Sequence, residues 1–211
     1  MGLFCSVAPY LDVMNGKPLD VGQQIGLLLP SSMQLLSIEL GSVAELALVD
    51  HATERVIYQC RLTFLPGDPV TVMKRAILSQ GECSPEPVYK AVMSDAVDRV
   101  FTDYLVERYQ IIISDDPRTG QGVFGWERLI LVALDRKLHV YYCQPATGQL
   151  QQINDREAFE QLQGEIWGRL DDRERHLAIV CKRPIEGAES NDSGRPSTHS
   201  LPCALPGEPP F

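Results

Sequence analysis

The sequence has no apolar run of the roughly 18 residues that a membrane-spanning helix needs. It also lacks the start of a secretory signal, because residues 1–12 contain no basic residue ahead of an apolar stretch. These two absences predict a cytoplasmic protein without a membrane span.

Basic charge is scarce. The chain has 19 Lys and Arg against 28 Asp and Glu, which gives a formal net charge of −9. Binding to a nucleic-acid backbone needs a basic stripe that neutralises phosphates, and no segment of the sequence supplies one. We therefore expect no direct nucleic-acid binding, and we expect the partner to be another protein.

The six cysteines are far apart, and none forms a CxxC pair or stands at metal-ligand spacing from a histidine. Cys60, Cys143 and Cys181 lie inside apolar runs typical of strands, where a thiol behaves as a small core residue. This pattern favours a reduced protein over a disulfide scaffold or a metal site.

Common catalytic motifs are also missing. The sequence contains no GxSxG, no GxxxxGK[ST] and no HExxH, and its four histidines are isolated from one another. No acid, base and nucleophile can be grouped from the sequence. We therefore predict no catalytic residues, no resident metal and no cofactor, and a binding protein more readily than an enzyme.

What the sequence does contain is organised around residues 109–142. Ile111, Ile112 and Ile113 form a β-branched run without alternation, which is typical of a strand covered on both faces. Polar and glycine residues follow, and from Val123 apolar residues recur at helical spacing up to Leu134. A second strand is predicted from Val140. This stretch predicts a strand, loop, helix and strand of an α/β domain.

The rest of the chain completes an α/β (α+β) fold. Strands are predicted over 34–40, 44–49 and 55–65, in a β-rich region 25–66 that forms an antiparallel meander. A helical region is predicted over 69–108, with a short helix near 70–78 and a longer one after Ser84. A βαββαβ core with helices packed on its sheet is predicted over 109–183. Residues 1–183 are thus expected to form a single globular domain, and the Pro/Gly/Ser-rich residues 184–211 a disordered tail.

The loop 115–122 is the candidate binding site. It follows the carboxyl end of a predicted central strand and precedes a helix, where α/β proteins bind ligands and where backbone amides hold anions. The candidate residues are Asp115, Asp116, Arg118, Gly120, Gly122 and Trp126. The two aspartates are also a possible Mg²⁺ ligand pair, with a turn as the simpler interpretation.

Residues 109–182 resemble the GNAT acetyltransferase superfamily. The resemblance rests on a strand that leads to Gly120-Gln121-Gly122 and on the helix that follows, and the later elements are similar too. It implies acetyl-CoA as cofactor, with its pyrophosphate at this helix. Pro117 stands where the family has Gln or Arg, Arg118 comes one place later, and Asp115 and Asp116 are negative where the pyrophosphate would lie.

A second resemblance is to accessory proteins of bacterial plasmids, phages and integrative elements. It rests on scattered residues, namely Ile113-Ser114-Asp115, Trp126, Val140-Tyr141 and Ile166-Trp167-Gly168. It implies a small acidic protein that inhibits conjugal transfer, as fertility-inhibition factors do, by binding a component of the conjugation system. Two hypotheses follow: a non-catalytic inhibitory protein, or an acetyltransferase-like enzyme with an altered acetyl-CoA loop.

Overall fold

The computed structural model describes residues 7–66, 73–83, 86–114, 122–144, 149–167 and 177–185. Helices and β-strands both contribute to it, which confirms the α+β class. The chain divides into two compact units, residues 1–111 and 112–211. No helix in the described ranges is long and apolar enough to cross a membrane.

Unit 1 contains an antiparallel sheet whose strands are neighbours in the order β1-β2-β3-β4-β5. Its strands are β1 (Leu19–Asp20), β2 (Met33–Leu40), β3 (Val43–Asp50), β4 (Arg55–Phe64) and β5 (Lys74–Cys83). The three predicted strands correspond to β2, β3 and β4 to within a residue or two at each end. The strand at β5 replaces the predicted short helix, so the helical region 69–108 was wrong over residues 74–83.

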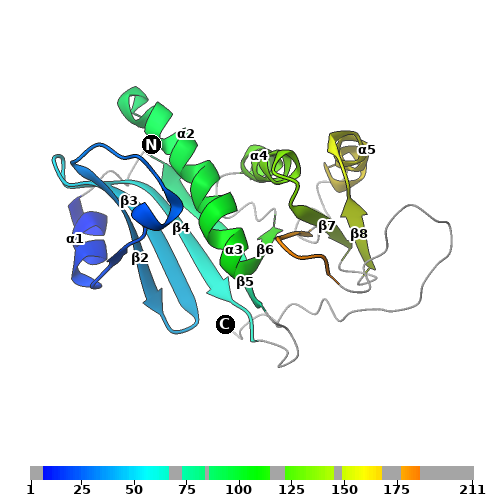
Figure 1. Cartoon of the computed structure of the whole chain (residues 1–211), viewed down its shortest axis with the longest axis horizontal. Coiled ribbons are helices and arrows are strands. Elements are labelled where there is room, and N and C mark those ends of the chain that lie inside the picture. Colours follow the sequence, from blue (N-terminus) through cyan, green and yellow to red (C-terminus); the bar gives the residue numbers. More distant parts are fainter. Residues whose placement is uncertain are drawn as a thin grey trace. The chain divides into compact units, whose positions relative to one another are not determined.

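The helices of unit 1 contact both faces of this sheet (Figure 1). They are α1 (Val7–Asn15), the 3-10 segments η1 (Gln23–Ile25) and η2 (Pro87–Tyr89), α2 (Lys90–Arg99), the π-helical η3 (Val100–Leu105) and α3 (Val106–Arg108). Val13 of α1 packs with Val49 of β3 in one buried cluster. The next residue, Asp50, reaches Tyr89 of η2 instead. Because neighbouring strand residues point to opposite faces, α1 and η2 lie on opposite faces of the sheet.

The boundary between the units falls within β6 (Tyr109–Ser114). Ile111, Ile112 and Ile113 are all buried, as the apolar run predicted. Unit 2 continues with α4 (Gly122–Asp135), β7 (His139–Gln144), β8 (Gln149–Ile153), α5 (Arg156–Trp167) and β9 (Leu177–Cys181). Ile166 and Trp167, which contribute to the second resemblance, belong to α5.

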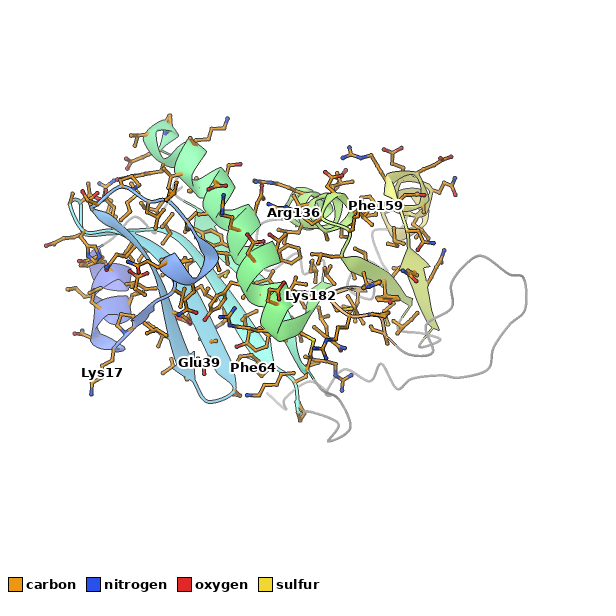
Figure 2. The ribbon with its side chains drawn as sticks, viewed as in Figure 1. Lys17, Glu39, Phe64, Arg136, Phe159 and Lys182 are labelled. Carbon is orange, nitrogen blue, oxygen red and sulfur yellow. The ribbon has the colours of Figure 1, made fainter. Side chains whose placement is uncertain are left out.

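In unit 2, β7 pairs antiparallel with β8 on one side and with β9 on the other. All five residues of β9 are buried, as expected for a strand covered on both faces. Leu129, Ile130 and Ala133 form the buried side of α4, and Phe159 of α5 is fully buried (Figure 2). The described chain ends at Ile185, whose backbone N–H donates to the Tyr141 hydroxyl over 3.1 Å. Pro184 and Ile185, the first two residues of the predicted tail, lie within the described ranges, and residues 186–211 lie outside them.

Candidate functional site

The predicted binding loop is described only at its two ends. Strand β6 ends at Ser114 and helix α4 begins at Gly122, so residues 115–121 do connect a strand to a helix. Asp115, Asp116, Arg118 and Gly120 lie outside the described residues. Gly122 is the first residue of α4, and Trp126 lies in its second turn, where the structure describes the backbone alone.

Sequence reasoning missed one signal in this loop. Residues 120–125 read Gly-Gln-Gly-Val-Phe-Gly, which is the GxGxxG spacing of dinucleotide-binding loops. That fingerprint functions in a unit where the strands on either side of the helix are parallel and the second strand ends near an acidic residue. Here the two strands that flank α4 in the sequence, β6 and β7, are not neighbours in the strand order, both neighbours of β7 are antiparallel to it, and residues 136–154 contain no Asp or Glu. The spacing therefore occurs without the context that gives it a dinucleotide site.

A group of polar contacts surrounds Asp50, at the end of β3. The Asp50 side chain is 5% exposed. Its carboxylate accepts hydrogen bonds from the backbone N–H of Ala52, the hydroxyl of Thr53 and the hydroxyl of Tyr89, each over 3.0 Å. Burial raises the pKa of this carboxyl, but these bonds and one from Ser32 outweigh burial and hold the pKa below its ordinary value. Asp50 is thus a charged anchor whose acceptors are already occupied.

The neighbouring His51 belongs to a separate chain of hydrogen bonds. Gln34 Nε2 donates to Asp20 Oδ2 over 3.3 Å, which places Gln34 Oε1 against His51 Nε2 at 2.7 Å. The N–H of His51 Nε2 therefore donates to Gln34 Oε1, and His51 Nδ1 is hydrogen-bonded to the Tyr10 hydroxyl at 2.8 Å. Both ring nitrogens of His51 thus have a hydrogen-bond partner.

These two polar groups organise structure, because each connects the sheet to a different element. Asp50 connects β3 to η2 through Tyr89, whereas His51 connects the turn after β3 to α1 through Tyr10. The carboxylate and the imidazole have different partners, so they do not form the paired acid and base of a catalytic relay. Their chemistry is that of a scaffold.

Other chemistry-bearing residues are spread out in the described chain. Cys60, Cys143 and Cys181 are buried thiols. Burial raises the pKa of Cys181 to about 12, and its thiol donates to the Arg183 carbonyl over 3.0 Å. Within the described ranges, no three His, Cys, Asp or Glu residues are arranged to hold a metal ion.

Large apolar side chains are exposed on the α1 side of the sheet in unit 1. Leu11 and Met14 of α1 are 51% and 37% exposed, and Leu40 at the end of β2 is 60% exposed. Leu11 and Met14 are three residues apart, so they are neighbours on the helix surface. Gly16, just after α1, lies against Ile38, and Leu40 points to the same sheet face two residues further on. We call Leu11, Met14 and Leu40 the α1-side patch.

Comparisons of this chain with protein-family models, curated proteins and solved structures found no match. Its function is therefore inferred from its own residues and contacts.

Proposed function

We propose that this chain is a non-catalytic, protein-binding accessory factor that contacts its partner through the α1-side patch of unit 1. The observation that carries the proposal is the exposure of Leu11, Met14 and Leu40 on one face of the sheet. Exposed apolar side chains that gather on one face mark interaction surfaces, whereas single ones are ordinary. Burial of such side chains against a partner removes apolar surface from water and so favours association.

The surroundings of the patch favour a protein as the partner. Lys17, just beyond α1, is exposed and points outward (Figure 2). Asp12 of α1 is also exposed, so charges of both signs border the apolar residues. A polar rim around an apolar centre is the usual composition of a protein–protein interface.

The identity of the partner rests on the resemblance to fertility-inhibition factors, which implies a component of a conjugal transfer system. On this proposal the chain acts in the cytoplasm and lowers transfer by occupying that component. The net charge of −9 suits a partner with a basic contact surface.

The test is plasmid transfer frequency in a donor that expresses the full chain. Expression of the chain should lower the frequency, and Leu40→Asp should restore it, because a carboxylate at the interface would be buried without a partner. Leu28→Asp is the matched control, since Leu28 is 92% exposed and lies outside the patch. Unchanged transfer on expression of the chain would refute the inhibitory role. Equal effects of Leu40→Asp and Leu28→Asp on the transfer frequency would refute the role of the α1-side patch in partner binding.

A second candidate is an acetyltransferase-like enzyme with an altered acetyl-CoA loop. The observation in its favour is that α4 begins at Gly122, the second glycine of the Gly-x-Gly sequence, so the free N–H groups of a helix start follow the loop. Titration calorimetry of the full chain with acetyl-CoA tests it. A heat of acetyl-CoA binding that is lost in the Gly122→Val variant would support this candidate. The absence of any binding heat with the unmodified chain at millimolar acetyl-CoA would eliminate it.

A further inference from the structure

The strand β8 of unit 2 lies at the edge of its sheet, and it lacks the usual features that prevent an edge strand from pairing with another sheet. β8 pairs with β7 and is the last strand in the order of neighbours. Figure 1 shows β8 as the outermost strand of this unit. Among the described residues, no strand pairs with its other edge. An edge of this kind presents backbone N–H and C=O groups to an additional strand.

The edge strand of unit 1 shows what protection looks like in the same chain. β1 has two residues, and one of them is Asp20. Pro18 precedes it and has no N–H to donate, and Lys17 before that has a φ of 53°, which breaks the extended backbone. A short strand, a proline and charged residues are the common means of preventing edge pairing.

β8 has none of these features. It has five residues, Gln-Leu-Gln-Gln-Ile, without proline, glycine or charge. The uncharged stretch is longer than the strand, since residues 138–154 contain no Asp, Glu, Lys or Arg. Two copies of a chain with a net charge of −9 repel each other, so an uncharged edge is where their approach is opposed least.

We propose that β8 pairs antiparallel with β8 of a second copy of this chain, around a two-fold axis at Gln151. In that register Gln149 faces Ile153 of the other copy, and Gln151 faces its own counterpart. A charged residue at the axis would repel the same residue of the second copy. A glutamine amide both donates and accepts hydrogen bonds, so it can pair with the glutamine of the second copy. The contact is isologous, as in most homodimers.

This inference is independent of the proposed function, because it concerns unit 2 and a second copy of the chain. Sedimentation of the full chain should show a dimer. Gln151→Glu and Gln151→Lys should each raise the dimer Kd by about fivefold or more, since like charges then face each other at the axis. An equimolar mixture of the two variants should recover the dimer, with native mass spectrometry showing an excess of the mixed species.

Recovery in the mixture separates the proposal from a simple folding defect, because two misfolded variants would not rescue each other. Gln161→Glu is the control: Gln161 is exposed on α5, and the same charge placed there should leave the dimer intact. Leu40→Asp should also leave it intact, which separates this interface from the α1-side patch. A monomeric chain, or a mixture without an excess of the mixed species, would overturn the proposal.

Discussion

The hydroxyl of Tyr89 donates a hydrogen bond to Oδ2 of Asp50 over 3.0 Å, and it connects the start of the long helical segment to the end of β3. The two residues are 39 positions apart, and both are buried. Close by, Arg55 of β4 forms an ion pair with Glu86, just ahead of η2. Polar contacts to β3 and β4 therefore fix the start of the helical segment against the sheet of unit 1.

Removal of the Tyr89 hydroxyl should destabilise unit 1. Tyr89→Phe keeps the buried ring but leaves the Asp50 carboxylate one donor short, and a hydrogen bond to a charged group contributes about 1.5–3 kcal/mol. We expect a loss of about that size in the free energy of unfolding, measured by urea denaturation. Asp50→Asn in the Tyr89→Phe background should add less than it does alone, because both changes remove the same contact. Strict additivity would show that the bond contributes nothing.

The Asp50 carboxyl should also give unit 1 a defined sensitivity to acid. Its pKa is lower in the folded state than the ordinary value of 3.8, so the unfolded state binds the proton more tightly. The stabilisation is complete well above pH 3.8 and is lost as the pH falls through the lower folded-state pKa. We expect the free energy of unfolding to decrease in this range and Asp50→Asn to flatten that decrease. Identical acid profiles for the two proteins would contradict this assignment.

The Cys181 thiol should respond in the opposite direction. Burial raises its pKa from 9.0 to about 12, so folding holds the proton that the unfolded chain releases. Its contribution to stability is therefore complete below pH 9.0 and declines as the pH rises towards 12. Cys181→Ala should remove this part of the alkaline decrease. Mass spectrometry can follow alkylation of Cys181 at about pH 8. We expect this alkylation to be slow in the native protein and fast after unfolding.

The sequence predicts the elements of this fold best where local pattern and pairing agree. The runs at 34–40, 44–49 and 55–65 are of strand length, rich in apolar residues and separated by turn residues, and all three are strands. The run at Ala76-Ile77-Leu78 is too short for its period to separate helix from strand. Pairing of Leu78 with Leu62 in β4 makes it a strand, and that long-range contact decides what the local pattern leaves open.

Two other features could not be predicted, for related reasons. Helix α1 has nine residues, and the described side chains that pack in its buried cluster are Tyr10 and Val13, too few to show a helical period. The Asp50 anchor depends on Tyr89, and nothing near Asp50 in the sequence signals that partner. Around the predicted site, the sequence correctly placed the strand that ends at Ser114 and the helix that follows, while most of the candidate residues lie outside the described chain.

The Tyr141 hydroxyl should determine how firmly the segment after β9 is held. It accepts the backbone N–H of Ile185 over 3.1 Å, and the Tyr141 ring is 1% exposed. Tyr141→Phe preserves the ring and removes the acceptor, at a cost of about 1 kcal/mol. Amide hydrogen exchange at Ile185 should accelerate by about fivefold, while exchange in β9 stays the same. Unchanged exchange at Ile185 would show that other contacts hold this segment.

The start of α5 offers a test of which residue caps the helix. Asn154 and Asp155 are both residue types that cap helices, and Glu157 stands at capping-box spacing from Asn154. In the structure, Asp155 Oδ1 accepts the N–H of Ala158 over 2.8 Å, so Asp155 is the cap. Asp155→Ala should lower the free energy of unfolding by about 1 kcal/mol, whereas Asn154→Ala should change it by only a few tenths. Thermal denaturation of both variants decides between them, and a larger loss for Asn154→Ala would transfer the capping role to that residue.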